Sequence, residues 1–245
     1  MGMKIAIIGY GKMGQAIEQE IKNTPFSISK IIDDEKSLRD AEFSSDEVAI
    51  EFTEPQAHLN NIKILASKKV DIVSGTTGCE EHIEEIKKIV LANNIGFLRG
   101  TNFALGVHLF WKIVQNSAQL IDKLDEYDVF GHEIHHSKKK DSPSGTAITT
   151  AEILLKNIQR KNNIVTEKIN REISDNELHF SSTRGGNAFG IHEVYYDSPC
   201  DTIKISHTSK GRSSYSKGAI NCAKWLQDKK GFFTVDNYIK DRINE

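Results

Sequence analysis

Cysteine is scarce in this sequence, with three residues among 245. Cys79, Cys200 and Cys222 are scattered, odd in number and without the close spacing of metal ligands. They therefore predict neither a disulfide framework nor a zinc site built from cysteine. Isolated thiols of this kind are typical of a reducing compartment, and we expect a cytoplasmic protein.

Long apolar runs are also lacking, and the net charge is small. The first residues pass through Met-Gly-Met-Lys directly into Ile5–Ile8, which is too short for a signal peptide or a membrane span. Basic residues number 32 and acidic residues 34, which gives a formal net charge of −2 and a pI near 6.5. No overall field favours nucleic acid or an anionic membrane, so neither is expected as a partner.

What the sequence does contain is an alternation of strands and helices. Hydrophobic residues make up 38% and charged residues 27%, which suits one or two globular domains. Apolar runs and helical periodicity predict strands at 4–8, 28–32, 48–52, 70–74 and 95–98, and helices at 13–21, 56–68 and 80–92. This order predicts an α/β fold with a Rossmann-like, doubly wound parallel sheet, whose ligand lies across the carboxyl ends of the strands.

A glycine-rich turn follows the first predicted strand. Gly9–Gly14 has the G-x-G-x-x-G spacing that lets a pyrophosphate approach backbone N–H groups at a helix start. Asp33 lies 19 residues after Gly14, close to the interval of about 20 expected for an acid that binds the adenine ribose. Because Asp34 doubles this carboxylate and no arginine follows, we expect NADH to be preferred over NADPH. The alternative is that these glycines only allow close packing in an α/β protein and bind no nucleotide.

The pattern changes after a helix expected at 105–120. Alternating residues predict strands at 127–134, 164–170, 178–183, 192–196 and 202–208, with helices at 146–156 and 219–226. We therefore expect a second, α+β domain with an open mixed sheet. The predicted dinucleotide-binding domain comprises residues 1–104 and 213–245, and the predicted substrate-binding and oligomerisation domain comprises residues 105–212.

The densest polar cluster lies at Glu133–Ala147, between a predicted strand and a predicted helix. A helix start leaves backbone N–H groups unpaired and carries partial positive charge, so a small acid could bind there. Ser142 or Ser144 can cap this helix, and Pro143 suits its first position. Gly145 would let a ligand approach the backbone closely.

Proton transfer is the chemistry that this cluster favours. His135 and His136 would face opposite sides of the strand while it persists, so one of them can face a given pocket. An imidazole titrates near neutral pH, and a lysine crowded by other cations, as in Lys138–Lys140, gives up its proton more readily. A solvated basic loop and a metal site of His132, His135 and His136 are the alternatives; no metal is expected, because further clustered ligands are missing.

Several motifs occur together: Gly9–Gly14, Gly75–Gly78, Thr101–Phe103, and His-His-x-x-Lys-x-Asp-x-Pro-Ser-Gly-Thr-Ala from His135 to Ala147. They resemble the 4-hydroxy-tetrahydrodipicolinate reductases of the diaminopimelate branch of lysine biosynthesis, and the resemblance extends to His207-x-x-x-x-Arg212 and Lys217–Ala219. It implies hydride transfer from NADH or NADPH to C4 of a cyclic, dicarboxylated imine, which forms when the 4-hydroxy substrate loses water. It also implies a homotetramer built through the sheet of the second domain.

The resemblance further implies roles for single residues. His135 matches the general acid/base and Lys139 the proton donor. The substrate-holding positions are matched by His136, Gly145 and Thr146, to which we add Ser144. The cofactor contacts are matched by Gly9, Tyr10, Gly11, Lys12, Met13, Asp33, Gly75, Thr76, Thr77, Gly100, Thr101, Asn102 and Phe103. His192, His207 and Arg212 stay unassigned.

The chain departs from the family's pattern in two places. Asp34 stands where many members have an arginine after the ribose-binding acid, and the spacing between the second and third strands is short. Two other functions stay open: an amino-acid or aldehyde dehydrogenase on the same plan, and a nucleotide sensor that binds NADH without turnover.

Overall fold

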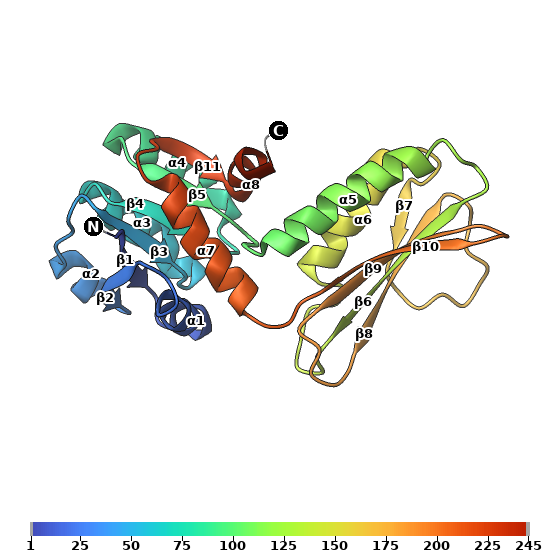
Figure 1. The fold of residues 1–245 in the computed structure, drawn as a ribbon, viewed down its shortest axis with the longest axis horizontal. Helices are drawn as coiled ribbons and strands as arrows, with labels where there is room; N and C mark the ends of the chain where they lie inside the picture. The colour runs from blue at the N-terminus through green and yellow to red at the C-terminus, as the bar shows by residue number, and fades with distance from the viewer. Residues whose placement is uncertain (1, 244–245) are drawn as a thin grey trace. The chain divides into compact units, whose positions relative to one another are not determined.

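The first unit of the molecule is organised around a six-stranded parallel sheet (Figure 1). The computed structural model describes residues 2–243. The unit takes in the chain up to Leu105 and again from Arg212 onward. Its strand order is β11-β5-β4-β3-β1-β2. The strands are β1 (Lys4–Ile8), β2 (Ser27–Ile32), β3 (Glu47–Glu51), β4 (Asp71–Ser74), β5 (Gly96–Arg99) and β11 (Gly231–Thr234).

Helices cover both faces of this sheet, because its strands are apolar on both sides. Ile5 and Ile7 of β1 point into one core, and Ala6 and Ile8 point into another. The first core is closed by α1 (Lys12–Ile21), α7 (Ser213–Leu226) and α8 (Val235–Ile243). The second core is closed by α2 (Glu35–Asp40), α3 (Pro55–Ser67) and α4 (Ile83–Asn93), which follows the short 3-10 helix η1 (Glu80–His82).

The chain reverses its direction of travel across the sheet between β1 and β3. From β1 it moves to β2 at one edge, then returns past β1 to β3 and continues outward. In open α/β sheets, ligands bind outside the carboxyl ends of the strands at such a switch point. The order of strands therefore marks the ends of β1 and β3 as the expected ligand site of this unit.

The second unit, Gly106–Gly211, contains a five-stranded mixed sheet in the order β10-β9-β6-β8-β7. Its strands are β6 (Asp128–His135), β7 (Asn163–Val165), β8 (Glu177–Arg184), β9 (Ile191–Asp197) and β10 (Thr202–Thr208). The strand β6 pairs in parallel with β8 and antiparallel with β9. Side chains from α5 (Leu105–Ile121) and α6 (Gly145–Asn157) pack with one face of the sheet in a single core.

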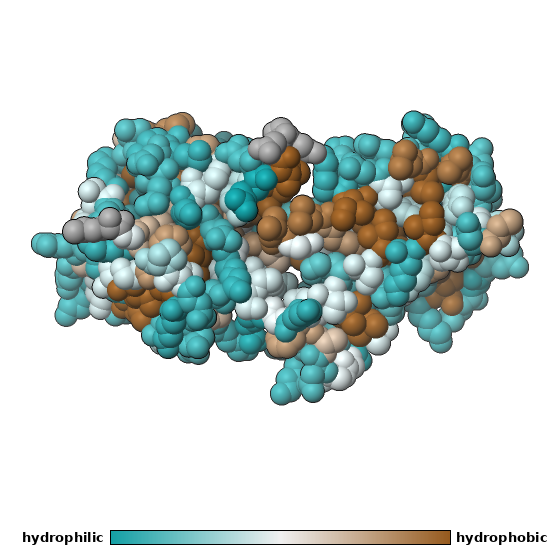
Figure 2. Space-filling model, viewed as in Figure 1, coloured by the Kyte–Doolittle hydropathy of each residue, from teal (hydrophilic) through white to brown (hydrophobic). Residues whose placement is uncertain are grey.

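The helix α5 is apolar on more than its buried side. Val107, Phe110 and Val114 are buried, whereas Ile113 and Leu120 are 54% and 65% exposed. Figure 2 shows the corresponding apolar surface along the course of α5. A contiguous exposed apolar surface of this kind is typical of a surface that becomes covered in an assembly.

The predicted fold class is confirmed, and the differences are local. The strand expected at 164–170 is wrong beyond Val165, because the chain leaves the sheet there and lines a cavity of about 650 Å³ against β6 and β8. The short elements α2, β11 and α8 were not predicted, since four to nine residues give little periodicity to recognise. Among residues 2–243, no helix is both long and apolar enough to cross a membrane.

Candidate functional site

A cleft of about 560 Å³ opens at the carboxyl ends of the first three strands of the first unit. It is lined by Ile8, Gly9, Tyr10, Gly11, Ile32, Asp33, Asp34, Glu35, Leu38, Phe52, Thr53, Glu54, Ala57 and Asn61. It lies at the switch point between β1 and β3. The structure thus brings the predicted Gly9, Tyr10, Gly11 and Asp33 together in one cleft.

The glycine turn has the geometry that a dinucleotide requires. Gly9 has a φ of +88°, and a Cβ there would lie 2.2 Å from the carbonyl oxygen of Phe52. At Gly14 a Cβ would lie 2.3 Å from the carbonyl oxygen of Gly9, so this glycine allows α1 to pack closely on the turn. Gly11 has no atom within 4 Å of a would-be Cβ, which leaves open space beside its backbone. A phosphate group fits such a cradle.

The two adjacent aspartates have different tasks in the structure. Asp33 accepts a hydrogen bond from the backbone N–H of Tyr10 at 2.6 Å, which ties it to the glycine turn. Asp34 caps α2 by accepting from the N–H and the hydroxyl of Ser37 at 2.8 and 2.6 Å. These bonds from Ser37 lower the pKa of Asp34, so its carboxyl group stays charged. Asp33 is the carboxylate tied to the glycine turn.

A buried polar network supports the loop after β4. Glu51 is fully buried at the end of β3 and accepts from the hydroxyls of Ser74 and Thr76 at 2.7 and 2.9 Å. Oε2, which accepts from Ser74, also lies 3.0 Å from Nδ1 of His58, which is fully buried too. The backbone N–H of Thr53 donates to the Thr76 hydroxyl at 2.9 Å. The network therefore fixes Thr76 from both sides.

The remaining predicted cofactor positions lie on the loops at the same end of the sheet. Lys12 and Met13 begin α1, Gly75–Thr77 follow β4, and Gly100–Phe103 follow β5. Phe103 is 3% exposed and its ring packs 5.7 Å from that of Phe52, centroid to centroid, so its side chain belongs to the core. Any contact of Phe103 with a ligand would have to come from its backbone.

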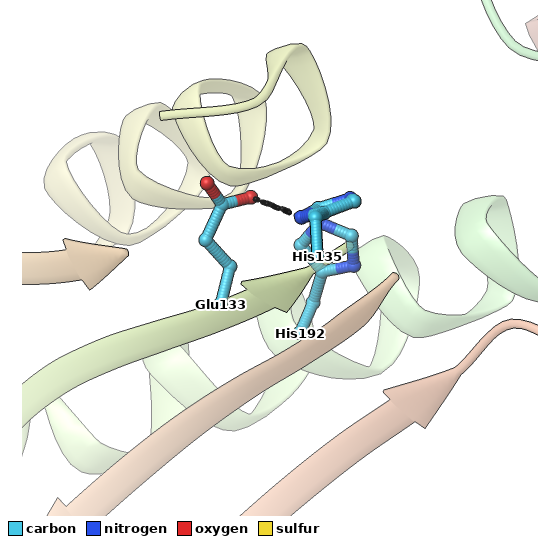
Figure 3. Close-up of side chains that lie close together, drawn as sticks. All are labelled: Glu133, His135 and His192. Atoms are coloured by element: carbon cyan, nitrogen blue, oxygen red, sulfur yellow. Dashed lines mark ion pairs between the residues drawn. The ribbon is translucent and has the colours of Figure 1, made fainter. Parts of the chain in front are cut away.

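In the second unit the structure gathers Glu133, His135 and His192 (Figure 3). Glu133 and His135 are two residues apart on β6 and share a face, while His192 lies on β9 opposite Glu133. Nδ1 of His135 lies 3.2 Å and Nε2 of His192 3.5 Å from the same carboxylate oxygen of Glu133. The two imidazole rings meet edge to face with centroids 5.1 Å apart.

Glu133 is fully enclosed, yet its charge is well compensated. Arg184 donates to its Oε1 at 2.7 Å, Ser182 at 2.8 Å and the N–H of Ser144 at 2.9 Å. Burial alone would raise the pKa of Glu133, but hydrogen bonds from His192, Ser144 and Arg184 outweigh it and hold that pKa well below its usual range. The carboxyl group is therefore ionised at neutral pH.

His135 is neutral in this environment. Burial lowers its pKa to about 4, and the nearby charges of Lys139 and Arg184 act in the same direction, whereas Glu133 opposes them. Its Nε2 would lie 2.9 Å from a Cβ placed on Gly190, so a larger residue at this position would clash with the ring. A neutral imidazole with one nitrogen beside a carboxylate can exchange a proton through the other.

The loop after β6 leads from the imidazole to the helix start. Lys139 forms an ion pair with Asp141 at 2.9 Å, and its side chain is 23% exposed. Ser144 caps α6 by accepting from the N–H of Ala147 at 3.2 Å. The expectation that Pro143 takes the first helical position is wrong, because the cap lies one residue after it and Gly145 comes first.

The start of α6 is suited to an anion. Gly145 has no atom within 4 Å of a would-be Cβ, and the first turn holds no acidic residue. Thr146 lies in the same turn and is half-buried. His136 begins the loop, and its N–H donates to the carbonyl of Ala188 at 2.8 Å. These placements put the predicted substrate residues along one short segment.

The metal site considered for His132, His135 and His136 does not form as such. Nδ1 of His132 lies 2.7 Å from the hydroxyl of Ser181 instead. Within residues 2–243, the group close enough to hold a metal is Glu133, His135 and His192, with ligand atoms inside 4.8 Å of one another. Its carboxylate is already engaged by Arg184 and by Ser144, which favours a charge network over a metal centre.

Sequence reasoning left Glu133, Arg184 and His192 without a role. Glu133 carried a signal, since a charged residue two positions before His135 in a strand must share its face. Arg184 and Ser182 gave none, because they lie 51 and 49 residues from Glu133 in the sequence. Their meeting depends on the parallel register of β6 and β8.

Both parts of the chain match one family. Residues 3–103 match the N-terminus and residues 106–239 the C-terminus of dihydrodipicolinate reductase. The chain is 36% identical over 239 residues to the 4-hydroxy-tetrahydrodipicolinate reductase of Christiangramia forsetii, and the match covers 98% of each chain. It is 37% identical over 240 residues to the enzyme of that name from Archaeoglobus fulgidus, and this match covers 96% of this chain and 84% of the relative.

Solved structures share the fold. The dihydrodipicolinate reductase of Paenisporosarcina sp. TG-14, with dipicolinate bound, superimposes with a TM-score of 0.75 at 22% identity and covers 96% of this chain and 98% of that one. An amine dehydrogenase from Mycobacterium smegmatis gives a TM-score of 0.58 at 11% identity, with 96% of each chain covered. At these identities the likeness concerns the fold alone.

Proposed function

The chain belongs to the dihydrodipicolinate reductase family, and from this premise we propose that it reduces 4-hydroxy-tetrahydrodipicolinate to tetrahydrodipicolinate with loss of water, in the diaminopimelate route of lysine biosynthesis. The similarity to the curated reductases over nearly the whole chain carries this proposal. The site adds chemical support, since a buried imidazole, an ammonium group and an anion-binding helix start occupy one segment of the second unit.

A nicotinamide dinucleotide supplies the hydride when it is bound. Gly9–Met13 would hold its pyrophosphate and Asp33 its adenine ribose, as the open space at Gly11 and the hydrogen bond from Tyr10 to Asp33 support. Gly75–Thr77 and Gly100–Phe103 complete the set of proposed contacts. In this proposal the first unit is the dinucleotide-binding domain and the second unit binds the substrate.

The substrate carries two carboxylates, which suit the start of α6. Ser144 already accepts from the N–H of Ala147, so the N–H groups of Gly145 and Thr146 would bind one carboxylate, and Gly145 lets the ligand come close. His136, Ser144 and Thr146 would orient it. Because no acidic residue occupies this turn, nothing there repels a dianion.

The reaction also takes up a proton. Adding hydride at C4 of the conjugated imine moves an electron pair toward the ring nitrogen, and the product gains one proton from the protein. Lys139 donates it in our proposal, since an ammonium group held by Asp141 at 2.9 Å has a fixed place near the helix start. His135 acts as the general acid/base through Nε2, because its Nδ1 faces Glu133.

We infer that NADH is preferred over NADPH. Asp33 is tied to the glycine turn, and Asp34 adds a second carboxylate beside it in the same cleft. Asp33 would accept hydrogen bonds from the ribose hydroxyls, and both negative charges would repel a 2′-phosphate. Arg39, the nearest arginine in the sequence, is engaged by Glu35 at 2.6 Å.

We also infer a homotetramer in the cytoplasm. The sheet face away from α5 and α6 carries Phe130 stacked on Tyr195 with centroids 4.8 Å apart, and Phe130 is 37% exposed. Aromatic side chains of this kind are enriched in protein interfaces. The free thiols of Cys79, Cys200 and Cys222 fit a reducing compartment.

The test is a steady-state assay of purified protein with NADH and NADPH side by side. We expect oxidation of either nucleotide only when the cyclic 4-hydroxy substrate is present, with the higher kcat/KM for NADH. Oxidation with open-chain amino or carbonyl compounds instead would point to the amino-acid or aldehyde dehydrogenase alternative. Tight NADH binding without turnover would point to a sensor.

A further inference from the structure

Glu133 is a buried charge to which the proposed reaction gives no task. It is 0% exposed, although burying a carboxylate is costly unless its partners compensate. Its two oxygens have different partners. Oε1 accepts from Arg184, Ser182 and the N–H of Ser144, and these bonds tie β6 to β8 and to the start of α6.

The other oxygen faces the catalytic segment. Oε2 lies 3.2 Å from Nδ1 of His135 and 3.5 Å from Nε2 of His192, and it accepts from the hydroxyl of Ser144 (Figure 3). The approach of Oε2 to Nδ1 of His135 is an ion-pair contact, and among the described residues this buried Nδ1 has no hydrogen-bond partner. Oε2 thus contacts two imidazoles besides the Ser144 hydroxyl, and holding β6, β8 and α6 together does not require those two contacts.

We propose that Glu133 is a positioning residue for His135: its Oε2 keeps the proton of the neutral imidazole on Nδ1, presents Nε2 to the substrate, and stabilises the imidazolium that forms when Nε2 takes up a proton. The inference rests on the proposed general acid/base role of His135. A carboxylate that fixes the tautomer and charge of a catalytic histidine acts by the same physics.

The groups around His135 make Glu133 the counter-charge. Lys139 comes from the loop after β6, Arg184 from β8 and His192 from β9, with His207 of β10 beyond His192. Lys139, Arg184 and His192 each lower the pKa of His135, and Glu133 raises it. Burial also lowers this pKa. Without the carboxylate, an imidazolium at this position would have only unfavourable surroundings among these groups.

The decisive variant is Glu133→Gln, which keeps the size of the side chain and removes its charge. We expect kcat to fall by about 10- to 100-fold with KM changed by less than about twofold. The nitrogen NMR signals of His135 should show less of the Nδ1–H tautomer, and the ring should titrate at lower pH than in the wild type. The matched control is Glu177→Gln, since Glu177 lies on β8 of the same sheet, is also buried, and is paired with an arginine, Arg171, from the segment before that strand. It should change none of these readouts.

The inference can fail in two ways. A wild-type spectrum in which His135 carries its proton on Nε2 would overturn it, whether or not the variant folds. So would a Glu133→Gln enzyme that loses thermal stability but keeps the tautomer, the titration and kcat, because Glu133 would then serve only to hold α6. If the wild type does not turn over the cyclic substrate but the tautomer still depends on Glu133, the proposed function fails and the coupling of Glu133 to His135 stands.

Discussion

Two fully buried glutamates, one in each unit, show how the same side chains can serve different ends. Glu51 and Glu133 both lie at or near the end of a strand, accept from serine or threonine hydroxyls, and face a histidine. His58 beside Glu51 is fully enclosed, and its Nε2 has no hydrogen-bond partner among the described residues. His135 beside Glu133 is 6% exposed and continues into the polar loop.

The surroundings of the two carboxylates explain the difference. Glu51 binds the hydroxyls that fix the loops after β3 and β4, so its network holds backbone in place. Glu133 is paired with Arg184 through Oε1, while its Oε2 accepts from the Ser144 hydroxyl and lies 3.2 Å from Nδ1 of His135. A buried glutamate and histidine therefore indicate a site of chemistry only when the imidazole also reaches a place that a ligand can occupy.

Removing each histidine should separate the two networks most strongly. His135→Ala is expected to lower kcat about 100-fold or more with unchanged NADH affinity, because a proton-transfer group is lost. His58→Ala should lower the melting temperature and leave kcat per folded molecule within about threefold, as expected for a core side chain. Steady-state kinetics and thermal unfolding measure both. Equal losses of kcat in the two variants would remove the distinction.

The lysine of the loop should have an effect of similar size. Lys139→Ala is expected to lower kcat about 100-fold, because the proposed proton donor is gone, while NADH binding stays the same. Lys138→Ala is the control, since Lys138 is an exposed neighbour in the same basic run. Unchanged turnover in Lys139→Ala would assign the proton to another group.

Neutralising Glu51 should affect the nucleotide and spare the imidazole. In Glu51→Gln one acceptor oxygen becomes an NH2 donor, so the network of Ser74 and Thr76 loses an acceptor and the loop of Gly75–Thr77 loosens. We expect NADH to bind about 10-fold more weakly by calorimetry, with the His135 NMR signals unchanged. Glu47→Gln, at the other end of β3 and paired with Lys30, should bind NADH normally.

Acid should weaken the second unit through His135. Its pKa is about 4 in the folded protein and about 6.5 in an unfolded chain, so the unfolded state binds more protons in this window. Stability should therefore fall as the pH is lowered from about 6.5 to 4. In His135→Gln the melting temperature should depend less steeply on pH across that range. A curve for His135→Gln that runs parallel to the wild-type curve would contradict the lowered pKa of His135.

The smallest effect concerns the adjacent aspartates. Asp34→Ala removes the cap of α2 and should lower the melting temperature by roughly 2 to 4 °C, with little change in NADH affinity. Asp33→Ala should weaken NADH binding more than it changes stability, because Asp33 is the carboxylate tied to the glycine turn. The opposite pattern would exchange their roles.

Much of the first unit could be predicted, because strands buried on both faces form continuous apolar runs. β1 was predicted residue for residue, and β2, β3, β4 and β5 to within a residue at either end. β11 was not predicted, because Gly231–Thr234 is short, half-exposed and lies in a charged C-terminal segment. The division of labour between Asp33 and Asp34 was also hidden, since it depends on where the six-residue helix α2 begins.

Only the part of the candidate site that lies in one segment of the chain could be predicted. His135, Lys139 and Ser144 share a stretch whose composition already indicates proton transfer beside an anion site. The setting of His135 depends on Arg184 and His192, which come from two other strands and carry no local pattern. Burial then lowers the pKa of His135 far below the neutral range that its residue type suggests.

The transfer of hydride from NADH to the substrate can be followed directly with deuterium. Purified protein is incubated with 4-hydroxy-tetrahydrodipicolinate and NADH that carries deuterium at C4 of the nicotinamide, and the product is examined by mass spectrometry and NMR. When the label is on the face of the nicotinamide that donates the hydride, we expect one deuterium at C4 of tetrahydrodipicolinate for each NADH oxidised. A product that acquires no deuterium with either face labelled, or no product at all, would contradict the proposed reaction.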